Sequence, residues 1–372
     1  MKSFISTNFD EFDNLDFVPT IIIGFYQAGE EKLFSQQYTQ LKKRFPDADI
    51  IGSSSESNIE NKIPHISMDK KNKYTYMCLN MDKQSYKLEI LNECVGQSFE
   101  DCNNQQALSN EQNRYGIIVF ATRYSKCLEQ MVSTLQQDIR EKNLFGAIAG
   151  SDIPGTNKGT VFYNGKYISS GALIWFINQR DYLLSGISVH DFNPIGFELE
   201  ITKADDYNIV ELEGHNALDV VEDMIGTLDK DTISSFEHPF FVATKQGMSY
   251  EKLPLCSIRS VNRKNKNIKL FRKVSAGNYL KIAIPLNRKE QEEKIDKLSR
   301  FFHERGVAFL FLGVAYKGHW NELEHIYLMR FAKNINMPFI GFHSLGEIGP
   351  LSEDTNSILL NQTLTLAVLS KR

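Results

Sequence analysis

Three short turns in the chain carry polar side chains at matching positions after a glycine. They read Gly52-SSSES-Asn58-Ile59, Gly146-AIAGS-Asp152-Ile153 and Gly341-FHSLG-Glu347-Ile348. In each turn the sixth residue after the glycine can accept a hydrogen bond, and the seventh is isoleucine. Amide and carboxylate oxygens of this kind suit an ammonium or amide group. We therefore take Asn58, Asp152 and Glu347 as candidate ligand-binding residues.

Other side chains in and near these turns add the groups that a zwitterion needs. Ser53, Ser54, Ser55 and Ser344 offer hydroxyl groups. Arg123, expected on the loop after a strand, could bind a carboxylate through two parallel hydrogen bonds. Together these groups fit a free amino acid or a similar small ligand. The alternative is that the three acceptors only cap helices or close turns by local hydrogen bonds.

The histidines raise the question of a metal or haem. His343, in the third turn, is the first candidate for a haem axial ligand, with a hydrogen-bonding pocket wall as the alternative. His319 and His325 are six residues apart, the wrong spacing for one face of a helix. Glu322 with His325, or His325 alone, could line a metal site, but we expect an exposed helix flank instead. Because no H-x-x-x-H pair or thiolate pair occurs, we expect no bound metal.

The motifs of common enzymes are missing from the sequence. It has no G-x-S-x-G elbow, no P-loop and no G-x-G-x-x-G fingerprint. One serine of the run 53–55 could be a nucleophile, but no histidine can be assigned as its base. Cys127 lies near the start of a predicted helix, where packing is the commoner role. We expect that the protein is not an enzyme, with a serine hydrolase as the least favoured alternative.

Each glycine turn closes the same frame of strand, helix and strand. The three frames span residues 21–52, 117–146 and 309–341. In their middle parts apolar residues recur three and four apart, which predicts amphipathic helices. The flanking apolar runs predict strands that are buried on both faces. The frames therefore predict an internal repeat in which Gly52, Gly146 and Gly341 each end a strand.

A hairpin follows the second frame. Asn164-Gly165 lies between two alternating runs, which is a strong signal for a two-residue turn. Hairpins of this kind should pair with the repeat strands. We predict an α/β fold with two related lobes of mixed β-sheet covered by helices, built from strand–helix–strand–hairpin repeats. The predicted domains are residues 1–205 and 206–372.

Composition narrows the class of protein. A chain of 372 residues suits two domains, and a net charge of −4 without charged blocks does not indicate nucleic-acid binding. No apolar run of about 18 residues and no secretion signal are visible, so we expect neither membrane insertion nor export. The five cysteines are widely spaced and odd in number, which fits a reducing compartment. The expected location is the cytoplasm.

Several segments resemble the FIST family of sensory domains. Residues 341–350, followed by Asn361-Gln362-Thr363-Leu364, resemble the signature of the FIST C-terminal domain. Residues 146–152, 160–165 and 193–218 resemble the FIST N-terminal domain, so that the resemblance spans about residues 20–370. The first turn departs from the family pattern: Ser57 replaces a glycine and Asn58 replaces a glutamate. The resemblance therefore supports the third turn more than the first.

The resemblance implies a bacterial sensory domain that binds a small ligand, with amino acids suggested for the family. The chain has no room for an output domain, so we expect a stand-alone sensor that signals through a partner such as a histidine kinase, a chemoreceptor or a cyclase. One branch of the family binds haem. The alternative is therefore a haem-binding nitric-oxide sensor that regulates a histidine kinase or a cyclic-di-GMP pathway, with His343 as axial ligand.

Overall fold

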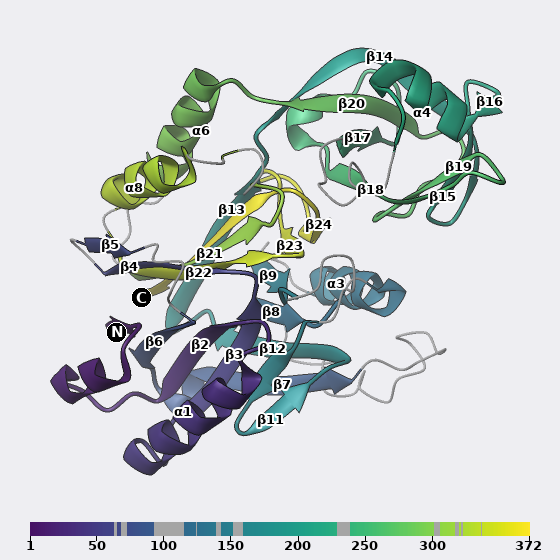
Figure 1. Ribbon diagram of the computed structural model, residues 1–372. Coiled ribbons are helices and arrows are strands. Elements are labelled where there is room, and N and C mark those ends of the chain that lie inside the picture. The colour runs from purple at the N-terminus through teal and green to yellow at the C-terminus, as the bar shows by residue number, and fades with distance from the viewer. Residues whose placement is uncertain are drawn as a thin grey trace.

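The computed structural model describes residues 1–62, 65–67, 73–92, 115–123, 125–138, 143–151, 159–228, 239–300, 306–316, 320, 323–335 and 337–372. The described strands form four sheets. Three sheets pack around one apolar core and carry helices on their outer faces, and the fourth closes into a barrel (Figure 1). We call the three-sheet part the body and the other part the barrel.

Each sheet of the body is built on a parallel pair of strands with a helix between them in the chain. The three sets are, in chain order, β2 (Ile21–Gln27), α1 (Glu31–Arg44) and β3 (Asp49–Ser55); β8 (Tyr115–Ala121), α3 (Lys126–Asp138) and β9 (Leu144–Ile148); and β21 (Gly306–Gly313), α8 (Glu324–Ile335) and β22 (Phe339–Ser344). The internal repeat predicted from the sequence is therefore confirmed.

The strand that follows a repeat pairs with the sheet of another repeat. Thus β4 (Asn58–Lys62) pairs with β22, β10 (Val161–Tyr163) with β3, and β23 (Gly346–Gly349) with β9. The exchange runs from the first repeat to the third, from the third to the second, and from the second back to the first. It ties the N-terminal and C-terminal parts of the chain into one unit.

Antiparallel strands complete the three sheets. Among them, β10 and β11 form the hairpin predicted at Asn164-Gly165, where both turn residues have the positive φ of a type I′ turn. The remaining described strands of the body are β1 (Lys2–Ser6), β5 (His65–Ser67), β6 (Tyr74–Asn80), β7 (Tyr86–Asn92), β11 (Lys166–Ile168), β12 (Gly171–Asn178), β13 (Tyr182–Val189), β24 (Ile358–Leu360) and β25 (Leu364–Lys371).

The inner faces of the three sheets share one core. Phe25, Phe120, Phe311 and Phe342 come from all three sheets, and their neighbouring ring centroids lie 4.7–6.0 Å apart. Burial of one such side chain contributes about 1.5–3 kcal/mol. On the outer faces, α1 covers the first sheet and α3 the second, while α8 and α6 (Arg288–Arg300) cover the third.

The barrel has an apolar core of its own. Its strands follow the order β14 (Phe192–Asp205), β20 (Tyr279–Pro285), β17 (Pro239–Ala243), β18 (Leu255–Asn262), β19 (Asn267–Leu270) and β15 (Asn208–Leu212). Because β14 also pairs with β15, the sheet closes on itself, and β16 (His215–Asn216) and α4 (Ala217–Ile225) follow at its edge. The predicted mixed α/β fold with two sheet lobes is confirmed.

The chain crosses between the lobes at positions other than the predicted one. It leaves the body between β13 and β14 and returns between β20 and α6. Residue 205 lies inside the barrel, at the turn between β14 and β15. The predicted division at residue 205 does not follow the sheets, because the strand exchange draws the third repeat into the body with the first two.

The repeat glycines face the backbone of the neighbouring parallel strand. The sequence had suggested that these glycines end their strands. Instead they lie inside β3, β9 and β22, because the strands continue to residues 55, 148 and 344. A Cβ atom at Gly341 would lie 2.0 Å from the carbonyl oxygen of Leu310. The equivalent distances at Gly52 and Gly146 are 2.3 and 2.1 Å. Only glycine allows this approach of the two strands.

We expect Gly341→Ala to lower the free energy of unfolding by about 3 kcal/mol or more, because the added methyl group collides with backbone that cannot move freely. Gly214→Ala is the control: Gly214 has a φ of +76° but no atom within 4 Å of a Cβ. Its cost should be only about 1–2 kcal/mol, from backbone strain alone. Equal losses in chemical denaturation would contradict the close-approach explanation.

Candidate functional site

The predicted serines at the end of β3 are buried and bonded to the protein itself. Ser54 Oγ donates to the carbonyl oxygen of Gly150 at 2.7 Å and accepts from the backbone N–H of Thr160 at 2.8 Å. The hydroxyl of Ser53 lies 3.1 Å from the carbonyl oxygen of Ser54. These contacts join the first glycine turn to the segments after β9 and before β10.

The first and third turns repeat one side-chain hydrogen bond. Ser344 Oγ donates to Glu347 Oε1 at 2.6 Å, and Ser55 Oγ is likewise bonded to Asn58 Oδ1. Each hydroxyl also lies near a carbonyl oxygen of the preceding parallel strand, at 3.3 and 3.0 Å. The local hydrogen-bonding role that the sequence left open is therefore present in both turns.

Glu347 is a fully buried carboxyl group on β23. Its Oε2 accepts hydrogen bonds from the backbone N–H of Thr363 at 3.0 Å and from the hydroxyl of Thr363 at 2.8 Å. Burial raises the pKa of Glu347 to about 8, although the bonds from Ser344 and Thr363 favour the charged form. The neutral acid is therefore favoured at neutral pH.

His343 contacts a side chain with each of its ring nitrogens. Nδ1 lies 2.7 Å from Ser57 Oγ within hydrogen-bonding geometry, whereas Nε2 lies 2.5 Å from Glu324 Oε1 without it. The side chain is only 2% exposed. An iron atom could bind His343 only after one of these contacts is displaced, so the haem alternative stays a prediction.

Arg123, Cys127 and His325 lie apart from these turns. Arg123 and Cys127 line a small hollow at the start of α3, where Arg123 Nη2 lies 3.4 Å from Ser170 Oγ. His325 is exposed on α8. Asp152, His319 and Glu322 lie outside the described residues. Within the described part of the chain, no group of three or more His, Cys, Asp or Glu side chains could hold a metal ion.

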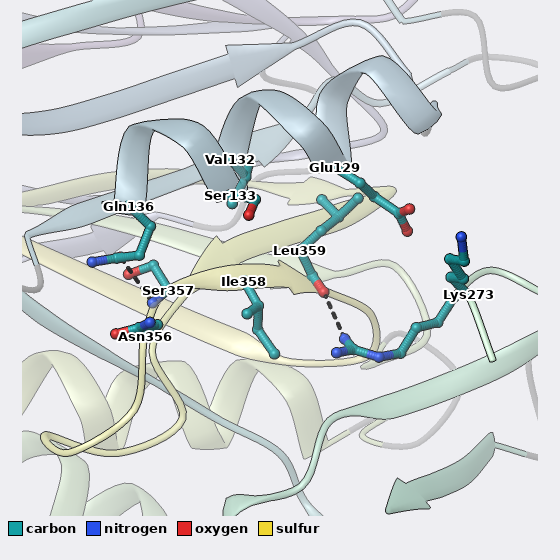
Figure 2. Close-up of a pocket in the computed structure, with 10 residues that line it drawn as sticks. Glu129, Val132, Ser133, Gln136, Lys273, Asn356, Ser357, Ile358 and Leu359 are labelled. Carbon is teal, nitrogen blue, oxygen red and sulfur yellow. Dashed lines mark hydrogen bonds between the residues drawn. The ribbon is translucent and has the colours of Figure 1, made fainter. Parts of the chain in front are cut away.

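A larger pocket lies between the body and the barrel. Its volume is about 300 Å³, and helix α3, the segment leading into β24 and the barrel all contribute to its wall (Figure 2). Its lining residues are Glu129, Val132, Ser133, Gln136, Arg272, Lys273, Asn356, Ser357, Ile358 and Leu359. This is a position where ligand sites commonly occur.

Opposite charges meet at this pocket. Burial raises the pKa of Glu129 above its ordinary value, although the hydrogen bond from Tyr207 and the charges of Arg272 and Lys273 favour the charged form. The hydroxyl of Tyr207, from the barrel, donates to Glu129 Oε2 at 2.6 Å. Arg272 Nη1 donates to the carbonyl oxygen of Leu359 at 3.4 Å. The pocket thus combines a carboxylate from one lobe with cations from the other.

Polar groups also line the body side of the pocket. Gln136 Oε1 accepts from the backbone N–H of Ser357 at 2.9 Å. The buried hydroxyl of Ser357 has no hydrogen-bond partner among the described residues. Buried polar atoms usually have partners, so a bound ligand or water is the expected partner here.

The sequence did not reveal this pocket. Glu129 looks like any charged residue on an amphipathic helix, and Arg272 lies in a mixed polar run. The two residues meet only because the barrel packs beside α3 (Figure 1). The pocket could be predicted from the sequence only if the packing of the two lobes were already known.

The buried carboxyl of Glu347 should make stability depend on pH. In the unfolded chain it titrates near its ordinary pKa of 4.5, but in the folded protein it holds its proton up to about pH 8. The free energy of unfolding should therefore fall as the pH rises from about 5 to 8. Glu347→Gln removes this contribution, so the variant should gain about 2–4 kcal/mol relative to the native protein over that range.

Urea unfolding at pH 5, 6.5 and 8 measures this difference. Glu353→Gln is the control, because Glu353 is exposed on the turn before β24. Its free energy of unfolding should change with pH in the same way as that of the native protein. A parallel profile for Glu347→Gln would show that Glu347 is already charged in the folded state.

Comparison with known proteins places the chain in a family. The model of the FIST N domain family matches residues 20–215, more than half of the chain. This match ends at residue 215, so a FIST C-terminal domain over residues 206–372 stays a prediction. No curated protein matches the sequence. Within the described residues, no helix has the length and apolar character needed to cross a membrane. The chain belongs to the FIST N domain family, a family of sensory domains in signal transduction.

Proposed function

We propose that this protein senses a small molecule that binds in the pocket between body and barrel, and that it signals through a partner protein. The observation that supports this most is the make-up of the pocket. Both lobes contribute to a hollow of about 300 Å³, with Glu129 on one side and Arg272 and Lys273 on the other. A ligand there touches both lobes, and binding can therefore change how they are held together.

A free amino acid or a similar zwitterion fits this arrangement best. Arg272 can bind a carboxylate, and Glu129 can bind an ammonium group. Gln136 and Asn356 add amide groups, while Val132 and Leu359 offer apolar contacts. The volume is at the lower end of the range for ligand pockets, which suits a small ligand. The buried serines and Glu347 would then support the core of the body, at a distance from the ligand.

The haem alternative needs a different state of His343. The ring would have to give up its contact with Ser57 or with Glu324 before it could bind iron. A histidine kinase, a chemoreceptor or a cyclase remains our proposal for the partner. A Soret band in the absorption spectrum of the purified protein would favour the haem alternative and would count against an amino-acid sensor.

A thermal-shift screen of the amino acids tests the proposed ligand class. A ligand at 100 times its dissociation constant should stabilise the protein by about 2.7 kcal/mol, which is seen as a rise in Tm. Arg272→Ala should weaken binding of the active amino acid about 10- to 100-fold, because it removes a charge-assisted hydrogen bond. Isothermal titration calorimetry measures the change.

Two further variants make the result specific. Arg259→Ala is the matched control, since Arg259 is an exposed arginine of the same lobe that does not line the pocket. Its affinity should equal that of the native protein. Glu129→Gln keeps the shape of the pocket and should also weaken binding by losing the ammonium contact. If no amino acid raises the Tm of the native protein, the proposed ligand class is wrong.

A further inference from the structure

The two crossings between body and barrel lie side by side. One is the short link between β13 and β14, and the other is the link between β20 and α6. The backbone N–H of Leu286 donates to the carbonyl oxygen of Asp191 at 2.8 Å, and Phe192 is paired with Pro285. The barrel is therefore attached to the body by one narrow junction of two neighbouring segments (Figure 1).

Several other contacts between the lobes are polar and lie near the pocket. The hydroxyl of Tyr207 bonds to Glu129, and the backbone N–H of Ser257 donates to Asn361 Oδ1 at 3.1 Å. An exposed ion pair joins Lys252 to Asp354 at 3.5 Å. The main apolar cluster of the barrel forms inside its own sheet, and Phe271 alone among its members also packs against the apolar cluster under α3, within the described residues. Polar interfaces of this kind allow two lobes to move relative to each other.

The junction is held from both sides by buried side chains. The carboxylate of Asp191 is 3% exposed and accepts a hydrogen bond from Trp320 Nε1 at 3.0 Å. Trp320 packs edge-on against Tyr316 and Tyr327 in the core of the body. The ring of the preceding His190 packs edge-on against Phe241 of the barrel, at 5.1 Å between centroids.

Burial of the Asp191 carboxyl group costs free energy. Burial raises the pKa of its carboxyl to about 6, although Lys294 and Trp320 favour the charged form. Lys294, on α6, also donates to the carbonyl oxygen of His190. The hydrogen bond from the Trp320 indole to Asp191 therefore links the first crossing to the body. The bond from Lys294 to His190 links helix α6, which follows the second crossing, to the first crossing.

We propose that residues 190–191 and 286–287 form a hinge about which the barrel closes on the body when the pocket is filled, and that the bond between Asp191 and Trp320 sets the angle of the empty protein. The closing step rests on the proposed function. The lobes already meet at the pocket, where Tyr207 bonds to Glu129 and Arg272 to Leu359. A ligand that bridges Glu129 and Arg272 favours the arrangement that brings these two residues closest together. The hinge itself is a property of the empty protein and can be tested alone.

Tryptophan fluorescence can report on the hinge directly. The chain has two tryptophans, so Trp175→Phe leaves Trp320 as the single emitter. The buried Trp175 Nε1 has no hydrogen-bond partner among the described residues, and phenylalanine there leaves no acceptor unpaired. The probe is a mixture of the non-aromatic standard amino acids, each at about 1 mM, well above a micromolar dissociation constant. We expect the mixture to shift the emission maximum of Trp320. Trp320→Phe is the matched control, in which Trp175 in the body core should show no shift.

The empty protein provides the second test. Asp191→Ala removes the bond to Trp320 and should widen the range of lobe arrangements, which small-angle X-ray scattering records as a larger radius of gyration. Asp223→Ala is the matched control, because Asp223 is exposed on α4 of the barrel. It should leave the radius of gyration unchanged. Circular dichroism checks that both variants remain folded; if Asp191→Ala unfolds, Asp191→Leu, which is close to aspartate in size but has no acceptor, serves in its place.

The outcomes separate the hinge from the ligand. A rise in Tm without a shift in Trp320 emission would support the proposed amino-acid sensor and would overturn the closing step. No rise in Tm would contradict the proposed ligand class, and the scattering experiment would then decide on the hinge alone. An unchanged radius of gyration in a folded Asp191 variant would overturn the hinge.

Discussion

The backbone of a strand that leaves its own sheet must find hydrogen-bond partners elsewhere, and this constraint shapes the whole body. The strand after each glycine turn meets it by pairing with the sheet of another repeat. With three repeats the exchange closes into a ring. The first sheet is complete only when β10, which follows the second repeat, has paired with it. The third sheet is complete only when β4, which follows the first repeat, has paired with it. The body therefore forms as one cooperative unit, and its many contacts between distant parts of the chain favour slow folding.

This arrangement explains why polar turns can lie inside the protein. Ser55 and Ser344 occupy equivalent places and satisfy the acceptors three residues further on. The exchange also brings the turns themselves together, so that Ser57 of the first turn meets His343 of the third. A set of polar residues at equivalent positions can thus be a structural feature of a repeat. The charged groups that face an open pocket lie instead where the repeats meet the barrel.

The sequence was sufficient for features that depend on local patterns. The strand–helix–strand frames, the hairpin at Asn164-Gly165 and the mixed α/β class all follow from periodicity and turn chemistry. The place of Gly341 within its strand was missed, because the close approach to Leu310 depends on the packing of two strands. The strand exchange and the barrel were missed because periodicity does not determine which strands pair. The pocket was missed for the same reason, since Glu129 and Arg272 belong to different lobes.

The adjacency of the two crossings has a consequence for the architecture. Phe192 and Pro285 face each other across one strand pair, so the barrel begins and ends at nearly the same point in space. In topological terms the barrel is an insert, and a short turn in its place would leave every strand of the body with its partners. The body can therefore serve as a constant frame onto which inserts of different chemistry are grafted. Because α3 forms one wall of the pocket and the barrel another, exchange of the insert would change the shape and charge of the pocket while the frame stays the same.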